Sequence, residues 1–142
     1  MTRLSIALAL VALSTCAQSA EPREPVLGTV ARIVDGDTLD AQLDSGKIRI
    51  RLHGVDAPEK NQPYGKEAAA VLSSLVLNKQ VEIEPVSQDR YERMVAIVHI
   101  GNDTVNAALV RTGNAWAYRR YMRKSDAYLC ELEADSRKAK RE

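Results

Sequence analysis

The sequence predicts an α+β fold, in which five short strands form a Greek-key β-barrel of the OB type accompanied by about three helices. Five segments rich in β-branched and apolar residues are separated by turn signals. A helical pattern interrupts them between the third and the fourth segment, and helical patterns return near the carboxyl end. The chain of 142 residues is long enough for one domain with its own core.

The strand predictions rest on composition and on period-2 alternation. The third strand is the clearest, because apolar and basic side chains alternate from Lys47 to His53, which predicts one buried face and one exposed face carrying His53. The turn signal Asp44-Ser45-Gly46 precedes it. We expect strands over residues 26–34, 37–43, 47–55, 81–86 and 94–100.

The helix predictions rest on apolar residues at helical spacing and on stop and cap signals. Asn78 is a suitable stop for the first helix, and Gly113 for the second. Ser125 is a suitable N-cap for the third, whose packed side should include Tyr128 and Leu132. We expect helices over residues 65–77, 104–111 and 125–140.

The first 20 residues have the layout of a secretory signal peptide, which leaves residues 21–142 as the folded domain. Arg3 precedes a short apolar run, and small residues follow through Ala20. This layout predicts bacterial export to the periplasm or the medium. Two alternatives stay open: Cys16 lies in a loose lipobox and would become lipidated, or the apolar segment is a buried amino terminus. Unless Cys16 is lipidated, we expect no stable membrane partner, and we expect a monomer.

Charge and cysteine content narrow the function classes. The formal net charge of +1 does not indicate nucleic-acid binding, so any anion site must come from local arrangement. If Cys16 leaves with the signal peptide, Cys130 is the single cysteine, which excludes an intramolecular disulfide and a cysteine-based zinc site.

Two acidic clusters suggest a site for a hard cation. Asp35-Gly36-Asp37 follows the first strand, and Asp56 and Glu59 lie in a proline-containing loop. Carboxylates in such loops are the oxygen ligands that Ca²⁺ prefers. A plain alternative exists for each, because Asp-Gly-Asp also forms tight turns with glycine at positive φ, and the second cluster could be an ordinary loop before a helix. Likewise, an arginine in an alternating strand or a charge run usually faces solvent.

Taken together, five motifs resemble the staphylococcal nuclease, or thermonuclease, family. They appear in the order that is typical of that family, and the predicted strands and helices alternate as in that family. They span most of the chain that follows the apolar segment. They are VDGDT at 34–38, RLHGVDAPE at 51–59, QPYG at 62–65, DRYER at 89–93 and VNAALVRTG at 105–113.

The resemblance implies a five-stranded OB barrel that hydrolyses the 5′ P–O bond of DNA and RNA with Ca²⁺ and leaves 3′-phosphates. Asp37 and Asp56 match the calcium carboxylates, and Ala57 matches a position whose backbone carbonyl binds calcium. Asp35 matches an acid beside the metal that does not bind it.

The same resemblance assigns the phosphate-handling residues. Glu59 matches the carboxylate usually regarded as general base towards the attacking water, and Arg51 and Arg93 match the two arginines that bind the phosphate. Tyr91 matches a tyrosine near that phosphate. The chemistry needs such groups, because cationic forks neutralise the charge that a phosphodiester gathers in its transition state.

A basic, aromatic stretch could extend the contact with a polynucleotide. Tyr118 and Tyr121 can stack on bases, and the cations between and after them can contact phosphates. The alternative is a solvated connection before the last helix. The cations are Arg119, Arg120, Arg123 and Lys124.

One departure from the family pattern keeps a second reading open. Glu92 occupies a position where relatives commonly have glycine, directly before Arg93. It could pair with Arg93 and weaken phosphate binding, or point away. The second reading is therefore a catalytically weak or inactive nucleic-acid-binding module of the same fold, although the retained acids and arginines favour an enzyme.

Overall fold

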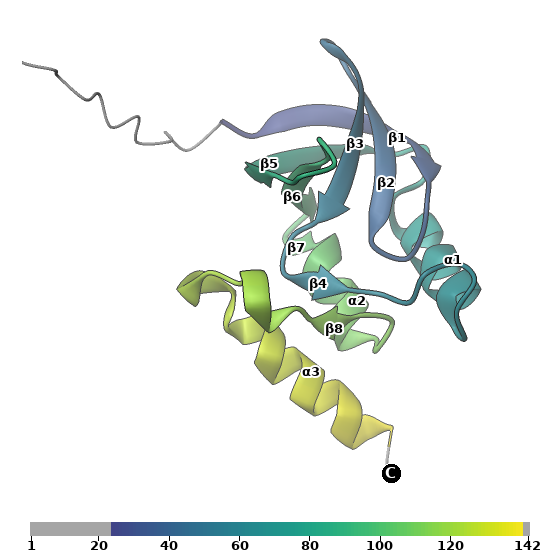
Figure 1. Ribbon diagram of the computed structural model, residues 1–142, viewed down its shortest axis with the longest axis vertical. Helices are drawn as coiled ribbons and strands as arrows, with labels where there is room; N and C mark the ends of the chain where they lie inside the picture. Colours follow the sequence, from purple (N-terminus) through teal and green to yellow (C-terminus); the bar gives the residue numbers. More distant parts are fainter. Residues whose placement is uncertain (1–23, 141–142) are drawn as a thin grey trace, which may run out of the picture.

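The computed structural model describes residues 24–140, and five strands in it close into a barrel (Figure 1). The hydrogen-bonded order is β3-β2-β1-β5-β6, and a parallel pairing between β3 and β6 closes the circle. The predicted barrel is thus confirmed, whereas the expected signal peptide lies outside the described residues. The strands are β1 (Val26–Ile33), β2 (Thr38–Leu43), β3 (Gly46–Leu52), β5 (Gln80–Gln88) and β6 (Met94–Ile100).

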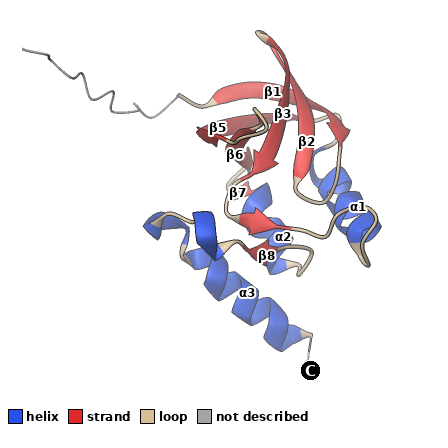
Figure 2. Cartoon of the chain, viewed as in Figure 1, coloured by secondary structure: helices blue, strands red, loops and turns tan. Residues whose placement is uncertain are grey.

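Within the described residues, three α-helices accompany the barrel (Figure 2). They are α1 (Gly65–Val76), α2 (Val105–Arg111) and α3 (Tyr128–Ala139). Figure 1 shows α1 beside the barrel and α3 at the far end of the molecule from β1. Within residues 24–140, none of the helices has the length and apolar character needed to cross a membrane. The short strands are β4 (Val55–Asp56), β7 (Asp103–Thr104) and β8 (Trp116–Ala117), and 3-10 turns span Arg119–Tyr121 and Lys124–Asp126.

The barrel interior follows from the alternation in the strands. Ile50 and Leu52 of β3 are fully buried, as are Leu39 of β2, Ile83 of β5 and Val98 of β6. Burying one such side chain contributes roughly 1.5–3 kcal/mol. The outer face of β3 is left to its basic side chains, and this placement positions the site described below.

The third strand ends earlier than the sequence predicts. β3 stops at Leu52, and Gly54 adopts a positive φ of 72° that turns the chain away from the barrel. Val55 and Asp56 then pair with Ala117 and Trp116 in a separate two-stranded sheet. The prediction of a continuous strand to residue 55 is therefore wrong, because after the turn these residues pair with a strand from a distant part of the chain.

His53 was expected on the exposed face of that strand and is instead buried. Its Nε2 lies 2.7 Å from Oδ2 of Asp126, which precedes α3. A buried imidazole needs such a partner. The pair therefore ties the end of β3 to the carboxyl-terminal segment.

The third helix also begins later than expected. Ser125 is not its N-cap, because residues 124–126 form a 3-10 turn and α3 starts at Tyr128. The Asp126 carboxylate fixes this turn by accepting a hydrogen bond of 2.6 Å from the backbone N–H of Arg123. The buried residues of α3 are Leu129 and Glu133. Leu132 packs against the core as expected, whereas Tyr128 is exposed.

The Asp126 cluster predicts a specific loss of stability in acid. Burial raises the pKa of Asp126, but hydrogen bonds from Arg123 and His53 outweigh it and lower that pKa to about 2. A lowered carboxyl pKa stabilises the fold above the ordinary value near 4, and this contribution disappears as pH falls through about 2. We expect a loss of about 2 kcal/mol in the free energy of unfolding over that range. Urea unfolding at a series of pH values checks it, and Asp126→Asn should flatten the profile.

Candidate active site

Asp37 lies directly before β2, and its carboxylate is buried and hydrogen-bonded. Oδ1 accepts a hydrogen bond of 3.0 Å from the Thr38 hydroxyl, and Oδ2 accepts one of 2.9 Å from the backbone N–H of Ala57. Asp35 accepts a hydrogen bond of 3.1 Å from the backbone N–H of Asp37. The β1–β2 loop and the loop after β4 are thereby held together.

Gly36 is required here for close packing. A Cβ at this position would lie 2.8 Å from the Cβ of Ala57 and 2.8 Å from that of Ala68. Gly36 is not among the residues of positive φ, which corrects the turn geometry considered from sequence. Asp35 instead stabilises the turn by accepting the hydrogen bond from the backbone N–H of Asp37. Because Gly36 has no side chain, Ala57 and Ala68 of α1 can approach it closely.

Arg51 connects the two acids expected to bind the metal. One guanidinium nitrogen, Nη1, lies 3.0 Å from Oδ2 of Asp37, and the other, Nη2, donates a hydrogen bond of 3.0 Å to Oδ1 of Asp56. Nη1 also donates to the Val55 carbonyl at 2.8 Å. The Arg51 side chain is 14% exposed, so the solvent-facing alternative does not hold. The two acids therefore share one guanidinium.

The electrostatics of this pair favour an added cation. Burial raises the pKa of Asp37 to about 7, although the charge of Arg51 acts in the opposite direction. When the pKa of a carboxyl group stays this high beside an arginine, further positive charge stabilises its ionised form. Within residues 24–140, no three His, Cys, Asp or Glu residues gather as a metal cluster. Asp37, Asp56 and a backbone carbonyl would thus need water or substrate oxygens to fill a calcium shell, and this hard-oxygen set fits that ion.

Trp116 is a neighbour of Asp56 that sequence reasoning missed. The two residues are directly opposite in the β4–β8 pair, so their side chains share one face of that small sheet. Both are about half exposed, with 50% for the Asp56 side chain and 48% for Trp116. Trp116 is also the only tryptophan in the sequence, which makes its fluorescence a reporter for this loop.

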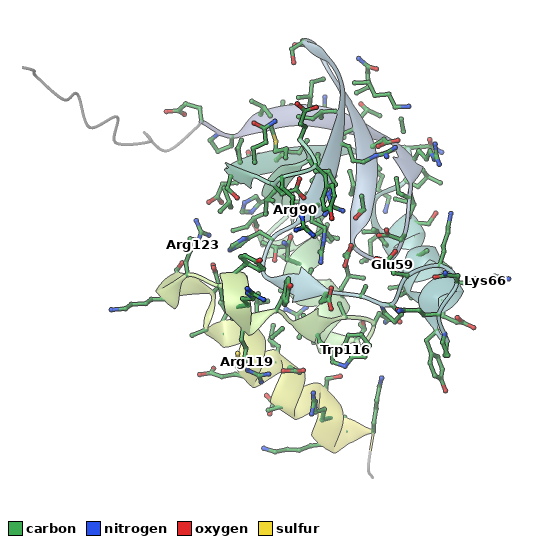
Figure 3. All side chains as sticks on the ribbon, viewed as in Figure 1. Glu59, Lys66, Arg90, Trp116, Arg119 and Arg123 are labelled. Carbon is green, nitrogen blue, oxygen red and sulfur yellow. The ribbon has the colours of Figure 1, made fainter. Side chains whose placement is uncertain are left out.

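Glu59 lies in the exposed loop between β4 and α1. Its backbone N–H donates to Oε1 of Gln62 at 2.9 Å, and its carbonyl accepts from the backbone N–H of Gln62 at 2.8 Å. A Cβ on Gly65 would lie 1.8 Å from that carbonyl oxygen, so only glycine fits. Figure 3 shows Glu59 on the side of the molecule where Lys66 of α1 lies. Glu59 itself is exposed.

Arg93 enters the site from the start of β6. Its neighbour Met94 pairs with Ile50 of β3, which sets Arg93 beside the strand that carries Arg51. Its Nε lies 2.7 Å from Oδ2 of Asp89, and its guanidinium carbon lies 5.5 Å from the centre of the exposed Tyr91 ring. The Arg93 fork is thus held by Asp89 on one side while the aromatic ring stays accessible.

Glu92 affects the backbone rather than the charge of Arg93. Among the described residues, Arg93 pairs with Asp89, and Glu92 forms no ion pair with it. Glu92 instead has a positive φ of 61°, which explains why glycine suits this position. We expect Glu92→Gly to stabilise the fold by about 1 kcal/mol, because the strain of a non-glycine residue is removed. Chemical denaturation measures this, and an unchanged kcat would exclude competition with substrate.

The basic stretch before α3 is partly used by the fold itself. The rings of Tyr118 and Tyr121 meet edge to face at 5.2 Å, and Tyr121 remains exposed. Arg119 pairs with Glu133 at 2.9 Å, and Arg123 pairs with Asp126 at 3.2 Å. Figure 3 shows Arg119 and Arg123 on this segment, away from Glu59. The solvated-connection alternative is therefore too simple, since Arg119 pairs with α3 and Arg123 pairs with the 3-10 turn before it.

A surface depression lies where β1, β2 and β3 meet the segment before β6. It has a volume of about 400 Å³ and is lined by Tyr91 and Arg93 together with basic residues of β1 and β3, but not by Asp37 or Asp56. The arginine and the tyrosine expected at the phosphate thus line this depression.

Comparison with known proteins places the chain among nucleases. The family model described as "Staphylococcal nuclease homologue" matches residues 49–142. Protein ParB of Escherichia coli is 37% identical over 96% of this chain and 80% of its own length. Micrococcal nuclease of Shigella flexneri is 38% identical over 78% of this chain and 69% of its own. An uncharacterized endonuclease of Escherichia coli O157:H7 is 39% identical over 80% of this chain and 74% of its own. The chain therefore belongs to the staphylococcal nuclease family.

Proposed function

We propose that this protein is a calcium-dependent nuclease that hydrolyses DNA and RNA at the 5′ P–O bond and leaves 3′-phosphates. Family membership makes it a phosphodiester hydrolase. The observation that carries the calcium assignment is the meeting of Asp37 and Asp56 on one guanidinium, beside the backbone of Ala57. These ligands are hard oxygens, which is the chemistry calcium requires.

The residues of the chain supply positioning and charge for the reaction. Arg51 and Arg93 present planar forks that can each hold two phosphate oxygens and neutralise charge in the transition state. Glu59 is placed on a loop three residues after Asp56, where its carboxylate can orient or accept a proton from the attacking water. Calcium, when bound, would polarise the phosphate and bring it to these groups.

The proposal is tested by incubating purified protein with 5′-labelled single-stranded DNA or RNA of 12 nucleotides on the order of micromolar concentration, with calcium, zinc or a chelator. Cleavage should require calcium and be abolished by the chelator. Zinc should not replace calcium, because the described site has no nitrogen or sulfur ligands. Removal of the 3′-phosphates by a phosphatase should lower the gel mobility of the products. Cleavage that persists in excess chelator would refute the metal assignment.

Export is a further part of the proposal. The amino-terminal pattern described above supports removal of residues 1–20 and activity in the periplasm or the medium. Amino-terminal sequencing of protein recovered after expression in a bacterial host would test it. A mature chain that starts at a lipid-modified Cys16 would instead support the lipoprotein alternative.

A further inference from the structure

The depression lined by Tyr91 and Arg93 contains a row of charged residues across the outer face of the barrel. Arg32 of β1 is in register with Asp40 of β2, and Asp40 is in register with Arg49 of β3. The parallel pairing of β3 with β6 continues this row towards Arg93. Lys47 lies two residues before Arg49 and therefore on the same face of β3. These four cations all line the depression.

Asp40 holds two of these cations in fixed positions. Arg49 forms a two-pronged pair with it, with Nε 2.7 Å from Oδ1 and Nη2 3.1 Å from Oδ2, and Lys47 lies 3.8 Å from Oδ2. The Asp40 side chain is almost fully buried, whereas those of Arg49 and Lys47 are 48% and 58% exposed. One buried carboxylate thus organises two cations whose outer surfaces face solvent.

The lining has an excess of positive charge, whereas the net charge of the whole chain is only +1. Arg32, Lys47, Arg49 and Arg93 face two carboxylates, Asp40 and Glu92. An excess of cations disfavours a metal ion and favours an anion. The exposed ring of Tyr91 lines the same depression, and base stacking on such a ring is a usual partner of phosphate contacts in single-strand binding.

We propose that this depression, which we call the β1–β3 groove, binds a phosphate of the polynucleotide that flanks the phosphate being cleaved. The proposal rests on the nuclease function proposed above and gives the direction in which a strand leaves the active site. Arg93 and Tyr91 belong to both places, so a strand whose reacting phosphate lies at Arg93 continues over Arg49 and Lys47 towards Arg32. The enzyme would then favour chains of several nucleotides over the shortest substrates.

The test uses the double variant Arg32→Ala with Lys47→Ala. Arg49 is left in place because it neutralises the buried Asp40. Binding of a fluorescent 12-nucleotide DNA is measured in chelator at several salt concentrations. Losing the contact with one single-strand phosphate should reduce the slope of log K against log salt by about 0.7. With calcium, kcat/KM should fall about tenfold on the 12-nucleotide substrate but less than about twofold on a dinucleotide.

Two controls separate groove binding from general charge effects. Arg32→Lys with Lys47→Arg keeps both charges and should keep the salt slope and the length preference of the wild type. Arg111→Ala with Lys138→Ala removes two exposed cations that do not line the groove, and it should leave both quantities unchanged. Circular dichroism confirms that each variant folds.

Three outcomes would overturn the proposal. The first is an unchanged salt slope in the alanine double variant, and the second is an equal loss on the 12-nucleotide and the dinucleotide substrate. The third is displacement of the DNA by a heptaglutamate peptide from wild type but not from the variant, which would make the groove a site for an acidic protein segment. Failure of the nuclease function would appear separately, as absence of cleavage by the wild type.

Discussion

Replacing Arg51 or Arg93 of the candidate active site by lysine is expected to lower kcat by about 10²–10³. Lysine keeps the positive charge but loses the fork that reaches two phosphate oxygens. Glu59→Gln should lower kcat by a similar factor of about 10² or more, because the amide cannot accept a proton. In all three variants the loss should appear mainly in kcat rather than in KM, since these groups act on the transition state.

The two arginines should differ in their dependence on calcium. Arg51 also holds Asp37 and Asp56, so Arg51→Lys should additionally change the calcium concentration needed for half-maximal activity. Arg93 contacts Asp89 instead, so Arg93→Lys should leave that concentration unchanged. Steady-state cleavage across a calcium titration measures both effects. Near-wild-type kcat in Arg51→Lys, Arg93→Lys and Glu59→Gln together would place the active site elsewhere and restore the binding-module reading.

Removing one anionic oxygen from the proposed metal site is the second large effect. Asp37→Asn and Asp56→Asn should each raise the half-maximal calcium concentration more than about tenfold, because calcium affinity follows the charge of its ligands. Asp56 is half exposed, so its variant should fold normally.

Asp44→Asn is the matched control for this pair. It removes one carboxylate from the exposed turn between β2 and β3, and the calcium requirement should not move. If Asp44→Asn and Asp56→Asn shifted the requirement equally, the effect would come from overall charge rather than from a ligand.

The local sequence pattern predicted the barrel because each of its strands is specified by a short segment of the sequence. The alternation of β3 fixes which side chains enter the core, and the stop at Asn78 works as expected, since that residue adopts a positive φ of 62°. Two of the features that the pattern missed depend on contacts between distant segments. The burial of His53 needs Asp126, and the separate strand β4 needs Trp116 and Ala117.

The candidate site shows the same division. Family resemblance supplied the acids and arginines, but their arrangement around Arg51 is a property of the folded chain. The fit of Gly65 against the Glu59 carbonyl and the positive φ of Glu92 are also invisible in spacing alone. A positive φ is uncommon for a glutamate, so the local sequence does not predict it.

A calcium titration followed by Trp116 fluorescence tests the central claim most directly. Because Trp116 lies opposite Asp56, calcium bound at the loop should change its emission, and the midpoint should coincide with that for cleavage. Both midpoints should shift together in Asp56→Asn and stay together in Glu59→Gln, where binding survives and turnover does not. Fluorescence and cleavage midpoints that are unaffected by Asp56→Asn would contradict a calcium site formed by Asp37 and Asp56.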